Sequence, residues 1–255
     1  MVDWDRGAYE DTAAELAPAA EHVVDQADIA PGQSVLDLGT GTGNAALLAA
    51  RAGADVMAVD PSPRLLELAR ERIGTGTFAV AKAEDLPFDD QTFDRVLSLF
   101  AVIFSDDPQQ AATEILRVLK PPGKALITAW EPVGAMHEAL GILGDATRAA
   151  AGGPTRERFP WGDADRVRRL FAGATVDVDR AQITFEAPST KAYMERFESR
   201  HPAGMLFKDV LTRAGTYEEI RARAVQAIQD ANESATGLRV TSSYLVFTVS
   251  HRGAG

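Results

Sequence analysis

Three glycines that alternate at positions 39, 41 and 43 are the residues whose types and spacing most directly suggest chemistry. They lie in "VLDLGTGTGN", directly after an apolar run and directly before a run rich in Ala and Leu. Glycine adopts positive φ at little cost and allows a ligand to approach the backbone closely. A glycine turn between a predicted strand and a predicted helix therefore indicates a binding site for an adenosine-containing cofactor.

An acid follows these glycines at a distance that suits ribose recognition. Asp60 stands 21 positions after Gly39, at the end of the next predicted strand. A carboxylate at that point can accept hydrogen bonds from both ribose hydroxyls of an adenosine cofactor. A tight strand–helix turn without any ligand is the structural alternative, and the presence of Asp60 makes it the less favoured of the two.

The spacing of the glycines also distinguishes two classes of cofactor. Dinucleotide-binding folds use Gly-x-Gly-x-x-Gly, a pattern that would place the third glycine at position 44. Residue 44 is Asn, and the sequence has Gly-x-Gly-x-Gly instead. This difference disfavours a nicotinamide-dependent reductase.

The elements that must position these residues alternate between strand and helix through the first half of the chain. Strands are predicted at 35–38, 55–59, 78–81, 93–102 and 124–130, and helices at 44–52, at 62–73 and from about 108. Ser62 followed by Pro63 is a typical helix start. Strands that are separated by helices pair in parallel through right-handed crossovers, so the pattern predicts an α/β fold with a doubly wound sheet.

The pattern changes after Trp130. Helical segments at about 131–160 and 188–233 alternate with strand-like runs at 174–187 and 238–252. We expect one domain over residues 1–255, in which the two helical segments are inserted as a cap, rather than two independent domains.

Composition limits the compartment and the partners of the protein. The 255 residues include no cysteine, which excludes disulfides, thiolate zinc sites and cysteine nucleophiles. The net charge of −11 repels phosphate backbones, so no nucleic-acid partner is expected. No apolar run reaches about 18 residues and the N-terminus is acidic, so we expect neither a membrane partner nor a secretory signal. The absence of cysteine favours a cytoplasmic protein, although it is also compatible with export.

The four histidines, at 22, 137, 201 and 251, lack the spacing of metal ligands, and no metal site is predicted. His137 and His201 are in the predicted cap, where a histidine can act as a general base or can simply pack. His201 is the preferred catalytic candidate, because it precedes Pro202 and Gly204 at a predicted break between helices.

Four stretches within about residues 30–130 resemble, in the same order, the motifs of class I S-adenosylmethionine-dependent methyltransferases. They are "VLDLGTGTGN", "VMAVDPSPRLLELAR", "AKAEDLPFDDQTFDRVLSLF" and "EILRVLKPPGKALITAW". The second half is similar to a bacterial small-molecule subgroup (methyltransferase type 11/25-like) in "FPWGDADRVRRLF" and "SSYLVFTVSHR". The resemblance implies a mostly parallel seven-stranded sheet of the Rossmann-like methyltransferase fold, with helical cap insertions.

This resemblance also implies S-adenosylmethionine as the cofactor and S-adenosylhomocysteine as its product. The implied contacts are Pro61, Leu65, Ala83 and Glu84 for the adenine, Asp60 for the ribose hydroxyls, and Gly39, Thr40, Gly41, Phe100 and Tyr9 for the ribose and methionine portions. Within this set, the carbonyl oxygen of Phe100 would accept the methionine ammonium, and Tyr9 belongs to a segment that would fold over the methionine end.

Three positions depart from the family's pattern. Lys82 stands where many relatives have an acid that accepts a hydrogen bond from the adenine amino group. Pro122 replaces a glycine of the usual Pro-Gly-Gly turn. The stretch "FAVIFSD" lacks the histidine that often follows the fourth strand, which removes one common catalytic candidate.

The activity that the resemblance implies is methyl transfer to an oxygen, nitrogen or carbon of a small organic acceptor. The aromatic residues of the predicted cap and the net charge of −11 favour an apolar or aromatic acceptor over a phosphate ester or a polymer. Aromatic residues of the second half could wall an apolar substrate cavity or could pack on the core, and they are Phe159, Trp161, Tyr193, Phe197 and Phe207. The alternative function is a non-catalytic cofactor-binding or regulatory protein that keeps the fold. A small-molecule substrate is the expected partner, for a monomer or a homodimer.

Overall fold

The computed structural model describes residues 2–152 and 159–253, whose contacts form two compact units. The sheet unit contains residues 16–130, 159–181 and 244–253, and the helical unit contains residues 2–15, 131–152 and 182–243. The predicted cap segment at 131–160 includes residues 153–158, which lie outside the described residues. The expectation of a single domain stays a prediction.

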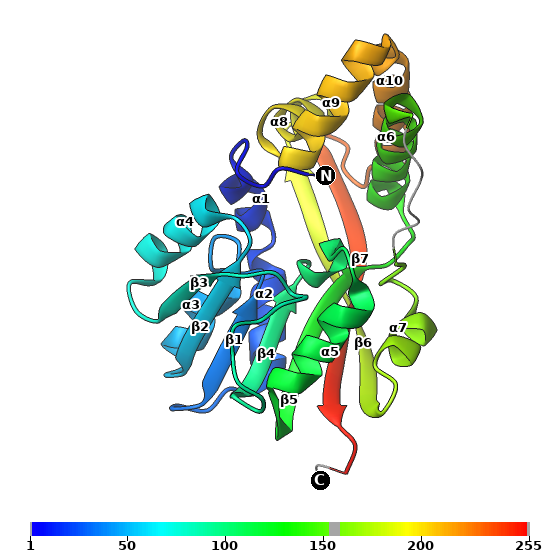
Figure 1. The fold of residues 1–255 in the computed structure, drawn as a ribbon. Helices are drawn as coiled ribbons and strands as arrows, with labels where there is room; N and C mark the ends of the chain where they lie inside the picture. The colour runs from blue at the N-terminus through cyan, green and yellow to red at the C-terminus, as the bar shows by residue number, and fades with distance from the viewer. Residues whose placement is uncertain (1, 153–158, 254–255) are drawn as a thin grey trace. The chain divides into compact units, whose positions relative to one another are not determined.

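The described part of the chain contains a seven-stranded sheet with the strand order β3-β2-β1-β4-β5-β7-β6 (Figure 1). The strands are β1 (Ser34–Leu38), β2 (Asp55–Asp60), β3 (Thr77–Val80), β4 (Phe93–Leu99), β5 (Leu119–Trp130), β6 (Ala174–Ala187) and β7 (Leu238–His251). Strands β1 to β5 pair in parallel, whereas β7 pairs with β5 in the antiparallel direction. This topology confirms the predicted doubly wound, mostly parallel, seven-stranded sheet.

Three helices of the sheet unit begin within one residue of the predicted positions 44, 62 and 108, and two more helices cover the sheet unit. They are α2 (Ala17–Ala27), α3 (Asn44–Arg51), α4 (Pro63–Ile73), α5 (Pro108–Val118) and α7 (Ala164–Leu170), with a short 3₁₀ helix η1 (Val102–Phe104). Ser62 caps α4, because its Oγ accepts a hydrogen bond from the Leu65 N–H at 3.1 Å. Helices α2 and α5 lie on opposite faces of the sheet, so both faces are covered (Figure 1).

Covering both faces explains why the central strands are apolar runs. Val35 and Leu36 of β1 and Val96 of β4 are fully buried. The same core contains Trp161 and Phe171, which come from the segment around α7. The loops that follow β1 and β4 therefore start from rigid, well-packed strands.

The helical unit is built from five helices within the residues described. They are α1 (Tyr9–Glu15), α6 (Ala135–Ala151), α8 (Thr190–Arg200), α9 (Pro202–Ala214) and α10 (Tyr217–Asp230). Helix α6 packs against α9 and α10. Arg221 of α10 donates from Nε to both carboxylate oxygens of Glu198 in α8, at 2.8 and 3.0 Å.

Among the helices described, none has the length and apolarity needed to span a bilayer.

Polar contacts attach α1 to α8. Asp11 forms an ion pair with Arg200, and Glu15 forms one with Arg196. The carbonyl oxygen of Arg200 also accepts a hydrogen bond from the Ala8 N–H at 2.8 Å. Segments that are far apart in the sequence are therefore joined within the helical unit.

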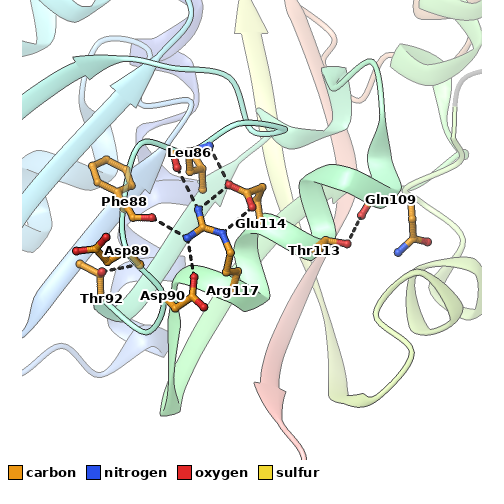
Figure 2. Close-up of polar contacts among 9 residues, drawn as sticks. All are labelled: Leu86, Phe88, Asp89, Asp90, Thr92, Gln109, Thr113, Glu114 and Arg117. Atoms are coloured by element: carbon orange, nitrogen blue, oxygen red, sulfur yellow. Dashed lines mark hydrogen bonds and ion pairs between the residues drawn. The ribbon is translucent and has the colours of Figure 1, made fainter.

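Arg117 of α5 braces the connection between β3 and β4 (Figure 2). Its guanidinium donates to the carbonyl oxygens of Leu86 at 3.0 Å and Phe88 at 2.7 Å. It also forms ion pairs with Glu114 at 2.7 Å and Asp90 at 2.9 Å. Glu114 in turn accepts a hydrogen bond from the Leu86 N–H at 2.9 Å. The hydrogen bond from Arg117 is the main reason why the pKa of Glu114 is lowered, so this carboxylate stays ionised.

We expect Arg117→Met to lower the free energy of unfolding by about 2–4 kcal/mol, because the buried Glu114 carboxylate loses its cation. Urea denaturation at pH 7 measures this change. The control is Arg168→Met in α7, whose ion pair with Asp165 is exposed and should contribute less than about 1 kcal/mol. Equal losses in the two variants would contradict the bracing role.

Candidate functional site

The loop after β1 adopts a conformation that requires glycine. Gly39, Gly41 and Gly43 have φ values of 72°, 55° and 85°, all in the left-handed region. The N–H groups of Gly39 and Thr40 donate to the carbonyl oxygen of Val59, which fastens the loop to β2 at 2.8 and 2.9 Å. A side chain at Gly39 would also collide with the Cβ of Ala101. The glycines that the sequence singled out are therefore needed for the turn itself.

Asp60 connects this loop to the loop after β2. Its Oδ2 accepts a hydrogen bond from the Gly41 N–H at 2.9 Å, and its Oδ1 accepts one from the Ser62 N–H at 2.8 Å. The residue is 6% exposed. A carboxylate offers about four acceptor positions, so two backbone bonds are compatible with further bonds to ligand hydroxyls.

Asp37 is a second buried acid next to the glycine loop. Its Oδ2 accepts hydrogen bonds from the Thr40 hydroxyl at 2.7 Å and from the Ala46 N–H at 3.0 Å. Burial raises the pKa of Asp37 to about 6, and the charge of Asp60 adds to this effect, although the two hydrogen bonds oppose it. Asp37 thus joins the loop to the first turn of α3.

The loop after β4 meets the loop after β1. The Ser98 hydroxyl donates to the carbonyl oxygen of Leu38 at 3.0 Å and accepts from the Val102 N–H at 3.2 Å. Between them, Phe100 has a φ of 51°, an unfavourable conformation for a bulky side chain. Strain of this kind persists only where neighbours enforce it, and it is concentrated at functional sites.

The loop after β3 is tied to both β2 and the start of α5. The Ala81 N–H donates to the backbone oxygen of Asp60 at 3.3 Å. Glu84 accepts hydrogen bonds at Oε1 from the N–H groups of Asp106 at 2.6 Å and Asp107 at 3.2 Å. The Glu84 carboxylate therefore has a structural role, while its contact with adenine stays a prediction.

The predicted cofactor residues of the sheet unit gather at one edge of the sheet. They follow the carboxyl ends of β1, β2, β3 and β4, where parallel α/β sheets bind ligands. Gly41 is bonded directly to Asp60, while Leu65 is buried and Pro61 is exposed. Lys82 is exposed, so its charge is in contact with water.

Tyr9 and His201 belong to the helical unit, where they lie close to each other. The ring of His201 has its centroid 5.9 Å from that of Tyr9, 6.1 Å from that of Trp4 and 4.9 Å from that of Phe197. Its Nδ1 accepts a hydrogen bond from the Ala203 N–H at 3.1 Å, so His201 caps the N-terminus of α9.

This environment changes what His201 can do. Burial lowers the pKa of His201 to about 4, so the ring is neutral at pH 7. Because Nδ1 is the acceptor in the cap, the neutral ring carries its proton on Nε2. Accepting a proton at Nδ1 would break the hydrogen bond that caps α9. The general-base role predicted from the sequence would therefore cost the helix its cap.

The aromatic residues predicted to wall a cavity have other packing partners. Trp161 is in the core of the sheet unit, where Phe159 packs against it. Tyr193 is buried against Phe185 in the helical unit. A groove of about 700 Å³ in the helical unit lies between α6 and α10, and none of the five predicted aromatics lines it.

Two functional candidates, Ser98 and Thr128, were missed in the sequence. Ser98 interrupts the apolar run of β4, and Thr128 interrupts that of β5. Both are completely buried and hydrogen-bonded to the loops described above. A polar residue inside a buried strand was the signal in the sequence that could have identified them.

In the part of the chain that the structure describes, no group of three or more metal-binding side chains is found.

Comparison with known proteins identifies a family for the central part of the chain. Residues 36–127 match the model of a family described as a methyltransferase domain. A demethylmenaquinone methyltransferase of Clavibacter sepedonicus is 41% identical over 99 residues, which make up 38% of this chain and 40% of that enzyme. An uncharacterized protein of Mycobacterium tuberculosis is 39% identical over 145 residues, or 55% of this chain and 53% of that protein. The chain thus spans about half the length of these curated relatives or less.

A solved structure supports the same fold over almost the whole chain. The YcgJ protein of Bacillus subtilis superposes with a TM-score of 0.60, covering 92% of this chain and 99% of that one. The two sequences are 17% identical, so this similarity concerns the fold alone.

Asp37 should make stability depend on pH. Its folded-state pKa of about 6 is above its ordinary value, so the folded protein keeps a proton that the unfolded chain releases. The free energy of unfolding should therefore fall as pH rises from about 4 to 6, by about 2–3 kcal/mol from this residue. Asp37→Asn should lack this decrease, while its amide oxygen can still accept both hydrogen bonds. Urea denaturation at several pH values tests the difference, and parallel profiles for the two proteins would contradict it.

Proposed function

We propose that the protein transfers a methyl group from S-adenosylmethionine to a small organic acceptor. Residues 36–127 match the methyltransferase domain family, and the strands of the described chain form the seven-stranded sheet of the class I fold. The observation that carries the proposal is the glycine loop after β1, bonded through Gly41 to the buried carboxylate of Asp60. This arrangement places a bare backbone beside an acceptor suited to ribose hydroxyls.

The charges at this edge of the sheet favour a cofactor without phosphate. Asp37 and Asp60 are both buried beside the glycine loop, and each contributes negative charge when it is ionised. An acid at the position of Asp60 can bind the ribose of either class of cofactor. An ionised Asp37 would in addition repel a pyrophosphate group at the same loop. S-adenosylmethionine has no phosphate and carries a positively charged sulfonium, so it suits this environment.

In this proposal the residues of the chain bind the cofactor and align it with the acceptor, because S-adenosylmethionine itself supplies the activated methyl group. Asp60 accepts hydrogen bonds from the ribose hydroxyls, and the carbonyl oxygen of Phe100 accepts one from the ammonium. The other proposed contacts, all in the sheet unit, are Gly39, Thr40, Gly41, Pro61, Leu65, Ala83 and Glu84. The contact of Tyr9 with the methionine end stays a prediction from the sequence. Alignment of acceptor, methyl group and sulfur can contribute roughly 7–11 kcal/mol of the barrier reduction.

We propose an apolar or aromatic acceptor. The net charge of −11 disfavours polyanionic substrates. The relative in Clavibacter sepedonicus is named for methyl transfer to demethylmenaquinone, which supports testing quinones beside phenols, carboxylic acids and amines. Release of S-adenosylhomocysteine with one of these acceptors tests the activity. Binding of S-adenosylhomocysteine without release for any acceptor would favour the non-catalytic cofactor-binding protein instead.

Asp60→Ala should weaken S-adenosylhomocysteine binding at least tenfold, since hydrogen bonds to a charged group contribute roughly 1.5–3 kcal/mol each. Isothermal titration calorimetry measures the dissociation constant. The control is Asp55→Ala, which removes the same charge from the exposed start of β2 and should leave affinity unchanged. An unchanged dissociation constant in Asp60→Ala would rule out the ribose assignment.

Two variants distinguish the helix-capping role of His201 from a general-base role of its imidazole ring. His201→Ala removes both and should lower the free energy of unfolding by about 1 kcal/mol, the usual contribution of an N-cap. His201→Asn restores the cap, so we expect it to recover that stability and to keep turnover within about threefold of wild type. A loss of turnover of about 10²-fold or more in both variants, at unchanged cofactor affinity, would support the general-base role predicted from the sequence.

A further inference from the structure

Two side chains of β5 hold the strained residue Phe100. The Thr128 hydroxyl oxygen accepts a hydrogen bond from the Phe100 N–H at 2.8 Å. The Trp130 ring is stacked on the Phe100 ring, with a centroid distance of 4.1 Å and an interplanar angle of 13°. Tyr244 of β7 packs its ring edge-on against Phe100 at 5.4 Å. Backbone and side chain of Phe100 are thus both fixed from the neighbouring strands.

The sheet geometry explains why these three side chains converge. Thr128 and Trp130 are two positions apart on β5, so their side chains point to the same face of the sheet. Tyr244 is the antiparallel partner of Trp130, and Thr128 is the parallel partner of Leu99, the residue before Phe100. This register places a hydrogen-bond acceptor and a stacking surface directly beside the end of β4.

The contacts with Thr128 and Trp130 stabilise Phe100 in its left-handed backbone conformation. A left-handed conformation costs a bulky residue free energy, so it persists only where its surroundings enforce it. Phe100 is 5% exposed and Thr128 is completely buried, so loss of either contact would not be replaced by bulk water. Without them, the loop after β4 would relax to a more common conformation.

We propose that Thr128 and Trp130 are positioning residues that set the affinity for the amino-acid portion of the cofactor by holding the carbonyl group of Phe100 in place. This inference rests on the proposed function. The strand order separates the two halves of the cofactor site. Asp60 ends β2 and Ala83 follows β3 on one side of β1, whereas Phe100 follows β4 on the other side. Changes on β5 should therefore affect the amino-acid portion and leave the adenosine portion unaffected.

Two ligands distinguish the affinity for the amino-acid portion from the affinity for the adenosine portion. S-adenosylhomocysteine contains adenosine and the amino acid, whereas 5′-methylthioadenosine has the adenosine and sulfur without the amino acid. Thr128→Val keeps the shape of the side chain and removes the acceptor, while Thr128→Ser keeps the acceptor. We expect Thr128→Val to weaken S-adenosylhomocysteine binding about tenfold and 5′-methylthioadenosine binding less than threefold. Thr128→Ser should bind both ligands within about threefold of wild type.

Trp130 gives an independent measurement if Thr128→Val does not fold. Trp130→Leu removes the stacked ring and should show the same selective loss, whereas Trp130→Phe keeps an aromatic ring and should retain affinity. Calorimetry on the full chain measures all dissociation constants, and thermal unfolding without ligand reports the stability of each variant.

Two results would overturn the positioning role of Thr128 and Trp130 and leave the proposed methyltransferase function standing. Either both ligands lose affinity equally in Thr128→Val and Trp130→Leu, or neither ligand loses affinity although wild type binds both. If wild type binds neither ligand, the proposed function fails, and this inference fails with it.

Discussion

The bond between the Asp60 carboxylate and the Gly41 N–H is the contact on which the candidate site depends. It joins the loops after β1 and β2, and the same carboxylate also holds the Ser62 N–H at the start of α4. Burying a carboxylate is costly unless it is hydrogen-bonded. The glycine loop supplies that compensation, so the acid and the turn stabilise each other and place an acceptor at the ligand-binding edge of the sheet.

The rest of the sheet unit holds the surrounding loops against this centre. Ser98 bonds the end of β1 to the loop after β4, and Thr128 holds Phe100 from β5. Arg117 fastens the connection between β3 and β4 to α5. Each loop is therefore supported by a side chain from a rigid strand or helix, which is the arrangement that a site needs when its main task is alignment.

Local signals in the sequence predicted the framework and part of the site. The glycine spacing, the cap at Ser62 and the apolar strands depend on neighbours within a few positions, so they are visible in a linear pattern. The supports of the site were not predicted, because they come from distant segments. Phe100 and Thr128 are 28 positions apart and become neighbours only through the register of β4 and β5. Likewise, the cap that His201 provides depends on where α8 ends and α9 begins, which the sequence placed only as a break.

A crystal structure of the protein with S-adenosylhomocysteine would show whether Asp60 binds the ribose of the cofactor. We predict both ribose hydroxyls within hydrogen-bond distance of the Asp60 carboxylate, about 2.5–3.0 Å, and the amino group of the ligand against the carbonyl oxygen of Phe100. A ligand bound elsewhere, or one whose ribose points away from Asp60, would contradict the proposed role of Asp60.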